Sequence, residues 1–159
     1  MPYPWGMRSI PEDRRTMRSP GQTLVLRESG CRLALENDLG SDLEALHTDG
    51  WLPQDGLSCD YLLCADVEGE PRGCCVELKG GGLDHAVKQL ASTFTAVKKE
   101  CGKGLTVVSA VIVRSGANIP QQRFFKLVTQ FKTAHRVPLR SVRSMTGKGS
   151  ESVSTWFKR

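Results

Sequence analysis

The fold of this chain is decided by residues 59–90, CDYLLCADVEGEPRGCCVELKGGGLDHAVKQL. Two apolar runs, 59–65 and 74–79, flank a loop that contains glycine and proline, which predicts two strands joined by a turn. Three glycines follow the second run. Apolar side chains then recur along one helix face from residue 83 to residue 100, and Gly102 follows as a stop signal. The stretch therefore predicts a strand-turn-strand-helix unit.

The residues before this unit predict a hairpin and one ambiguous segment. Two short β-like runs, 23–27 and 31–36, surround a turn. The segment 39–53 allows a short helix, because Ser41 and Glu44 resemble a capping box, or a turn-rich loop. The hairpin adds two strands, and the second segment stays open.

The residues after the unit predict a return to the sheet. The nearly continuous apolar run 105–113 is typical of a central strand covered on both faces. A second helix is expected over 120–134, opened by Pro120, and a last strand within 137–143. Together these segments predict a mixed α/β sheet with helices on its faces.

Length and composition indicate one core domain with two appendages. The chain has 159 residues and the composition of an ordinary globular protein. Residues 1–22, rich in proline and arginine, predict an irregular basic arm. Residues 23–145 form the expected core domain, and residues 146–159 are expected to be a flexible tail, in which Trp156 and Phe157 could dock.

Several protein classes are disfavoured by the sequence. No apolar run approaches the roughly 18 residues of a membrane span, and the N-terminus lacks the apolar core of a signal peptide. The six cysteines show neither C-x-x-C spacing nor zinc-finger histidines, so we expect them to be buried and reduced. These features predict a cytoplasmic protein without membrane contact.

Charge is distributed unevenly along the chain. Residues 23–82 contain four Lys or Arg and twelve Asp or Glu, whereas residues 119–159 contain nine Lys or Arg and one acid, Glu151. An acidic cluster beside a basic surface suits a polyanion bound over metal ions, although a solvated basic tail gives the same counts.

Three charged residues of the quoted stretch form a candidate site. Side chains alternate along a strand, so Glu77 and Lys79 share a face, and a hairpin about Gly69–Glu70 brings Asp60 opposite or diagonal to them. Such neighbours lie roughly 5–8 Å apart between Cβ atoms. Two carboxylates at that separation can share Mg²⁺ or Mn²⁺, with the Leu78 backbone carbonyl as a further ligand.

This combination suits phosphodiester hydrolysis. A divalent metal activates water and neutralises charge on the phosphoryl oxygens. A lysine beside the metal can orient that water and stabilise the developing negative charge. The residues therefore favour a metal-dependent phosphodiester hydrolase, against the alternative that they are ordinary charges at a sheet edge.

Asp60 at the head of one strand, Glu77-Leu78-Lys79 at the end of the next, and the helix that follows resemble the PD-(D/E)XK nuclease superfamily. The resemblance implies a restriction-endonuclease-like mixed sheet flanked by helices, and an Mg²⁺-dependent endonuclease that cuts DNA or sometimes RNA, with DNA favoured. It also implies that Asp60 and Glu77 bind the metal and that Lys79 orients the water. Several branches of the superfamily add a glutamine on the following helix, and Gln89 fits that place.

Two features depart from the superfamily pattern. Cys59 stands where proline is usual, and residues 1–22 show no leading helix. Such a helix sometimes carries an additional acid. The candidates for that acid, which the sequence does not rank, are Glu36, Asp38, Asp42 and Glu44.

Substrate contacts are predicted around the site, at Gly80, Gly81, Lys88, Arg123 and Lys126. Glycine lets a phosphate backbone approach closely, and the basic side chains would position phosphates without reading bases. Cutting both strands favours a homodimer or a larger complex. The alternative function is a catalytically inactive nuclease-fold module that binds nucleic acid or protein within a larger complex.

Overall fold

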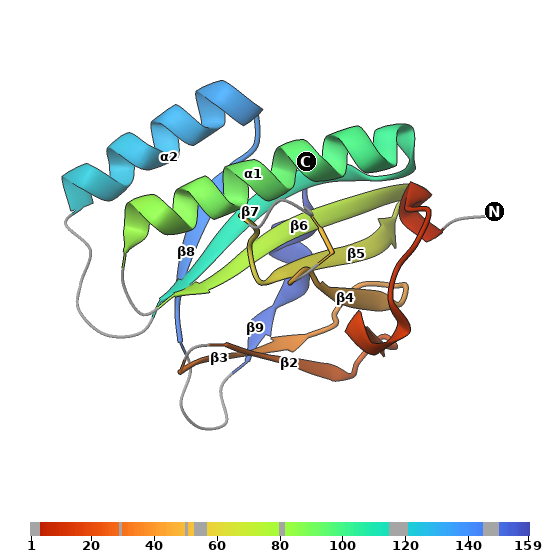
Figure 1. The fold of residues 1–159 in the computed structure, drawn as a ribbon. Helices are drawn as coiled ribbons and strands as arrows, with labels where there is room; N and C mark the ends of the chain where they lie inside the picture. Colours follow the sequence, from red (N-terminus) through yellow and green to blue (C-terminus); the bar gives the residue numbers. More distant parts are fainter. Residues whose placement is uncertain are drawn as a thin grey trace.

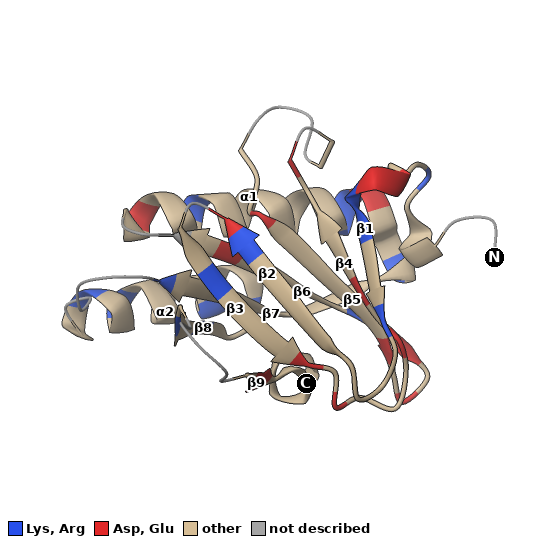
Figure 2. Ribbon diagram, turned by 90° about the horizontal axis from the view of Figure 1, so that it is seen from below, with Lys and Arg blue, Asp and Glu red and all other residues tan. Residues whose placement is uncertain are grey.

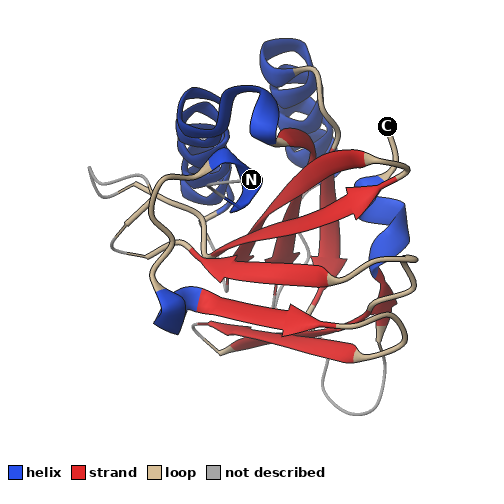
Figure 3. Cartoon of the chain, turned by 90° about the vertical axis from the view of Figure 1, so that its right-hand side faces the viewer, coloured by secondary structure: helices blue, strands red, loops and turns tan. Residues whose placement is uncertain are grey.

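The computed structural model describes residues 4–28, 30–49, 51–52, 57–79, 82–114, 121–144 and 150–159, with the backbone alone at Lys79. The chain is a mixed α/β protein in three layers (Figure 1, Figure 3). Two helices cover one face of a six-stranded sheet, and a three-stranded sheet lies against the other face. The predicted mixed α/β class is thus confirmed.

The six-stranded sheet has the order β1-β4-β5-β6-β7-β8. Its strands are β1 Arg15–Arg18, β4 Leu43–His47, β5 Tyr61–Val67, β6 Glu70–Lys79, β7 Thr106–Arg114 and β8 Leu139–Arg143. The helices are α1 Leu83–Cys101 and α2 Gln121–His135. The small sheet consists of β2 Thr23–Glu28, β3 Cys31–Glu36 and β9 Glu151–Ser152. Four 3-10 turns complete the described elements: η1 Pro4–Gly6, η2 Glu12–Arg14, η3 Gly102–Gly104 and η4 Val153–Phe157.

The sheet changes from antiparallel to parallel at β6. Strands β4, β5 and β6 form an antiparallel meander, whereas β7 runs parallel to β6, and β8 parallel to β7. Helix α1 connects β6 to β7 and α2 connects β7 to β8, as parallel pairing requires. The β5–β6 turn lies at Glu68 and Gly69, whose φ angles are 53° and 78°. Two positive φ angles are typical of a type I′ hairpin, one residue before the expected turn.

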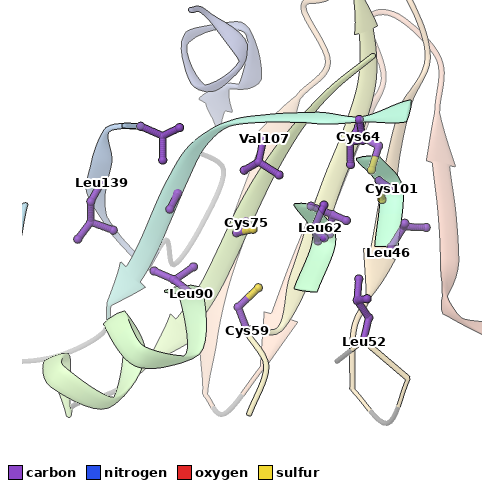
Figure 4. Packing of buried hydrophobic residues seen from close by; sticks show 14 of the residues in the cluster. Leu46, Leu52, Cys59, Leu62, Cys64, Cys75, Leu90, Cys101, Val107 and Leu139 are labelled. Carbon is purple, nitrogen blue, oxygen red and sulfur yellow. The ribbon is translucent and has the colours of Figure 1, made fainter. Parts of the chain in front are cut away.

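The helix-side core lies between α1 and the large sheet. As predicted, α1 is amphipathic, and its buried residues are Ala86, Leu90, Thr93, Val97 and Cys101. Figure 4 shows Leu90 packed near Cys75 on β6 and near Cys59, two residues before β5. All six cysteines are buried and in the thiol form, as the sequence predicts. These contacts fix α1 directly above the strands that carry Asp60 and Glu77.

Strand β7 is the central strand that its apolar run predicts. Ala110 and Ile112 belong to the helix-side core, and Val111 and Val113 belong to the core shared with the small sheet. A strand buried on both faces reads as a continuous apolar run because neither face meets water.

The N-terminal arm is more ordered than predicted. Residues 15–18 form β1, the edge strand that pairs with β4, and Met7 is buried against the core at 1% exposure. The ambiguous segment forms strand β4, with Leu43 and Leu46 on opposite buried faces. The capping box is wrong, because the Ser41 hydroxyl donates to the Asp66 carbonyl. Neither strand could be predicted locally, since each is stabilised by a distant partner.

The C-terminal residues also correct the prediction of a flexible tail. In the described part, β9 pairs parallel with β3, and Trp156 and Phe157 are buried at 2% and 0% exposure. The Ser109 hydroxyl on β7 donates to the Trp156 carbonyl. Aromatic burial outweighs the glycine and serine content of this segment. No helix in the described residues combines the length and apolar character needed to cross a membrane.

Candidate active site

The open end of the β5–β6 hairpin brings Asp60 and Glu77 together. The hairpin register places Leu62 opposite Cys75 and therefore, two residues further out, Asp60 opposite Glu77. Because side chains alternate along a strand, these residues share one face, and Leu62 and Cys75 belong to the helix-side core. The predicted approach of Asp60 to Glu77 is confirmed, and it occurs beneath α1.

Each of the two carboxylates accepts a hydrogen bond from the main chain of the other's segment. Glu77 Oε1 accepts the Asp60 backbone N–H at 3.1 Å, and Asp60 Oδ2 accepts the Leu78 backbone N–H at 2.8 Å. The Glu77 side chain lies close enough to the Asp60 carboxyl group to lower its pKa. Glu77 is 2% exposed, whereas Asp60 is only partly buried. The pair is therefore close enough to share one cation, and it opens to solvent on the Asp60 side.

The pKa of Asp60 is raised above its ordinary value. Burial is the main cause, and it outweighs the lowering by the hydrogen bonds with Leu78 and Glu77. The charge of Glu28 raises the pKa further, and His47 lowers it. Two carboxyl groups at close range disfavour each other's charge, and a divalent cation between them would offset that repulsion. This pair of oxygen donors therefore fits Mg²⁺ or Mn²⁺.

Gln89 acts on the segment that carries Asp60. Its Nε2 donates to the Ser58 carbonyl at 3.0 Å, so α1 holds the chain two residues before Asp60. The sequence places Gln89 beside the site, and the structure agrees. Its described contact is with the main chain, which makes Gln89 a positioning residue. A direct contact between Gln89 and substrate stays a prediction.

Two threonines complete this support. Thr93 on α1 accepts the Cys59 N–H through its Oγ1 at 2.8 Å. Thr48, directly after β4, donates its hydroxyl to the Cys59 carbonyl, and its N–H donates to the Asp60 carbonyl at 3.1 Å. The sequence gives no local signal for either role, because the partners are 34 and 11 residues away. Together they hold Asp60 between β4, β6 and α1.

Part of the predicted site lies outside the described residues. Gly80 and Gly81 are outside, as is the side chain of Lys79, whose backbone ends β6 opposite Arg114. Leu78 buries its side chain in the core shared with the small sheet. The proposed roles of Lys79, the two glycines and the Leu78 carbonyl therefore stay predictions.

The predicted basic substrate contacts, Lys88, Arg123 and Lys126, lie on the helix layer, and Figure 2 shows basic residues along α2. Arg123, near the start of α2, forms an ion pair with Asp84 in the first turn of α1. Lys88 and Lys126 are exposed. Arg123 is thus partly neutralised and links the two helices, which the sequence does not predict.

The four upstream acids have other surroundings. Buried Glu44 binds the Arg15 guanidinium at 2.7 Å, and Asp38 accepts hydrogen bonds from the hydroxyl groups of Ser152 and Ser154. Glu36 and Asp42 are exposed. The described contacts link none of the four to Asp60. Glu44 holds the arm, and Asp38 holds the C-terminal segment.

Glu28 is an acid near the site that sequence reasoning missed. It ends β2 in the small sheet, its carboxylate lies 3.2 Å from His47 Nε2, and its charge raises the pKa of Asp60. The Arg14 guanidinium contacts the other ring nitrogen of His47 at 2.9 Å. The packing of two sheets brings Glu28 to this place, and no local pattern indicates it.

Arg114 is a second residue that sequence reasoning missed. It ends β7, in register with Lys79 on β6 and Arg143 on β8. Its Nε donates to the Ser141 hydroxyl at 2.7 Å, while its buried Nη1 has no hydrogen-bond partner among the described residues. A buried unpaired donor is costly and commonly marks a ligand site. The sequence signal that could have indicated this role is an arginine at the end of a long apolar run that predicts a buried strand.

The described residues contain no group of three His, Cys, Asp or Glu side chains arranged to hold a metal. A metal here would therefore have two protein carboxylates, with the Leu78 carbonyl as the predicted third ligand. Mg²⁺ commonly binds through one or two carboxylates and completes its shell with water and substrate phosphates. The site thus fits a metal whose coordination shell is completed by water and by the phosphate groups of the substrate.

Comparisons of this chain with known protein families, with curated proteins and with solved structures find no match.

Proposed function

We propose that this protein is a metal-dependent nuclease that hydrolyses phosphodiester bonds in nucleic acid, with DNA favoured over RNA. The contact between the two residues, in which the Asp60 backbone N–H donates to Glu77 Oε1, carries this proposal. Two acids held together under a helix are a costly arrangement unless a cation joins them. The meander β4-β5-β6, followed by α1 and parallel β7, supports a restriction-endonuclease-like fold.

In this proposal the protein residues have distinct tasks. Asp60 and Glu77 hold Mg²⁺, and the Leu78 carbonyl adds a ligand. The bound ion supplies water activation and charge neutralisation at the phosphate. Lys79 orients the attacking water. Gln89, Thr93 and Thr48 keep Asp60 in place through hydrogen bonds to residues 58–60.

The carboxyl ends of the parallel strands supply a phosphate contact. The unpaired Arg114 Nη1 would donate to a phosphate oxygen, while the Ser141 hydroxyl holds the same guanidinium by its Nε. Arg114 pairs in register with Lys79, two residues beyond the Glu77–Ile112 pair. A scissile phosphate would then lie between the metal held by Asp60 and Glu77 and the guanidinium group of Arg114. We expect a cytoplasmic enzyme that acts as a homodimer or within a larger complex.

Cleavage assays test the proposal. Purified protein is incubated with single-stranded, duplex and branched DNA and with RNA, in Mg²⁺, in Mn²⁺ and in EDTA. Wild-type protein is compared with Asp60→Asn, Glu77→Gln and Lys79→Ala, and exposed Glu100→Gln on α1 is the matched acid control. We expect metal-dependent cleavage by wild type and Glu100→Gln alone.

Two outcomes would reject the nuclease. Cleavage that persists in Glu77→Gln would place the activity elsewhere or in a contaminant. Binding of nucleic acid without cleavage on every substrate would favour the inactive binding module instead. That module is compatible with carboxylates that bind only the Leu78 and Asp60 backbone amides.

A further inference from the structure

A cavity of about 520 Å³ opens at the amino-terminal end of β7, far from the carboxylates. Its walls come from the C-terminal parts of α1 and α2, from the start of β8 and from the last two residues of the chain. Strand β7 has nine residues, so the cavity lies roughly 25 Å from Arg114 at the other end. This is a separate part of the molecule from the candidate active site.

The lining of this cavity is strongly basic. No Asp or Glu occurs among its lining residues, which include six basic side chains: Lys98, His135, Arg136, Arg140, Lys158 and Arg159. These side chains come from α1, from the end of α2, from β8 and from the C-terminus. Like charges that converge on one concavity repel each other, and a bound anion would remove that repulsion.

The described contacts leave most of this charge without an acidic partner. Arg159 forms an ion pair with Glu70 at 2.8 Å. Within the described residues, no ion pair is found for Lys98, Arg136, Arg140 or Lys158. Burial and then the charge of Lys98 lower the pKa of His135.

Helix capping accounts for only part of the cluster. His135 ends α2, and Arg136 follows it at φ 60°, with its N–H donating to the Lys132 carbonyl at 2.8 Å. Cations at a helix C-terminus interact favourably with the helix dipole. Lys98 and Lys158 belong to other elements, so the dipole of α2 does not explain their convergence.

The fold leaves room at this place because β8 is short. It pairs with β7 only from Ala110 onward, so the preceding residues of β7 have no β8 neighbour and line the cavity. Val107 and Phe94 add an apolar wall. Apolar walls lower the local dielectric and strengthen charge-assisted hydrogen bonds.

We propose that this basic cavity is a second binding site that takes the phosphate groups of an anionic ligand. Guanidinium groups match phosphate oxygens in bidentate geometry, and the cavity volume is typical of small-molecule sites. A polyphosphate group or a stretch of nucleic-acid backbone supplies this chemistry. The proposal does not rest on the nuclease activity, because none of its residues belongs to the candidate active site.

Titration calorimetry in EDTA tests the site in the Glu77→Gln background, which removes metal-dependent chemistry. The probes are inorganic pyrophosphate and a single-stranded oligonucleotide at constant ionic strength. The test variant is Lys98→Gln with Arg140→Gln. The matched control is Arg8→Gln with Lys99→Gln, which removes the same charge from a different groove between α1 and the N-terminal arm. Thermal unfolding confirms that each variant is folded.

We expect the test variant to weaken binding by at least about tenfold and the control to change it by less than about twofold. A loss for pyrophosphate indicates a free phosphate ligand, and a loss confined to the oligonucleotide indicates nucleic-acid backbone. Equal weakening in both variants would show diffuse charge attraction and overturn the proposal. Absence of binding to either probe would overturn it as well.

Discussion

Glu44 on β4 and Glu77 on β6 are the same residue in similar positions, yet their partners differ. Both are 2% exposed and both lie on the large sheet. Glu44 binds the Arg15 guanidinium and accepts the Trp5 indole N–H, both at 2.7 Å. Glu77 instead accepts the Asp60 backbone N–H at 3.1 Å, and its side chain influences the pKa of the Asp60 carboxyl group. A buried acid paired with arginine is structural, whereas a buried acid paired with an acid indicates a site for a cation.

The largest expected effect concerns activity. Glu77→Gln should lower nuclease activity by about a thousandfold, because the loss of a metal-binding carboxylate removes several kcal/mol of transition-state stabilisation. Single-turnover cleavage in saturating Mg²⁺ measures this, with Glu100→Gln as control. A loss below about tenfold would mean that Glu77 does not hold the metal.

For stability we expect the reverse order, with Glu44→Gln more destabilising than Glu77→Gln. Glu44→Gln should lower the free energy of unfolding by about 2 kcal/mol, because Arg15 and the arm lose a buried charged partner. Glu77→Gln should change it by less than about 1 kcal/mol, because the amide oxygen can still accept the Asp60 N–H. Urea unfolding without metal measures both. A greater loss in Glu77→Gln would make Glu77 the structural acid.

Gln89→Ala should lower activity by about 10- to 100-fold, as expected when a residue that positions a metal ligand is removed. Gln89→Glu serves as a comparison, since its carboxylate cannot donate to the Ser58 carbonyl and should repel Asp60. We expect weaker Mg²⁺ binding in both variants, measured by the metal dependence of cleavage. Activity loss with unchanged Mg²⁺ dependence would favour a direct contact with substrate.

Two acids should give opposite pH dependences of stability. The pKa of Asp60 is raised mainly by burial, so its stabilising contribution is complete at low pH and is lost as pH rises through the folded-state pKa. Asp60→Asn should therefore be relatively more stable than wild type at neutral pH. The measurement is urea unfolding in EDTA between pH 3 and pH 8, and an unchanged difference across this range would contradict the raised pKa.

Asp38 should give the opposite pH dependence of stability from Asp60. Its desolvation would raise the pKa, but hydrogen bonds from Ser152 and Ser154 lower it overall. Its contribution is present above the unfolded-state pKa and is lost as pH falls through the folded-state pKa. Asp38→Asn should loosen the C-terminal segment, seen as faster exchange of the Ser154 amide hydrogen. Similar exchange in wild type and variant at neutral pH would exclude this role.

The site was more predictable than its surroundings. Strand parity and a hairpin turn are local, so they sufficed to place Asp60 opposite Glu77 and Gln89 on the helix above. Strands β1, β4 and β9 depend on partners far along the chain, and their sequences carry no periodic signal of that pairing. Glu28 and Arg114 were missed for the same reason, because sheet-on-sheet packing and strand order bring them to the site.

The central claim is that Asp60 and Glu77 form a cation site. Electron paramagnetic resonance with Mn²⁺ tests it directly, because free and bound Mn²⁺ give distinct signals. We expect one bound Mn²⁺ per chain in wild type and in Glu100→Gln, and at least about tenfold weaker binding in Glu77→Gln. Equal Mn²⁺ binding by wild type and Glu77→Gln would contradict the claim.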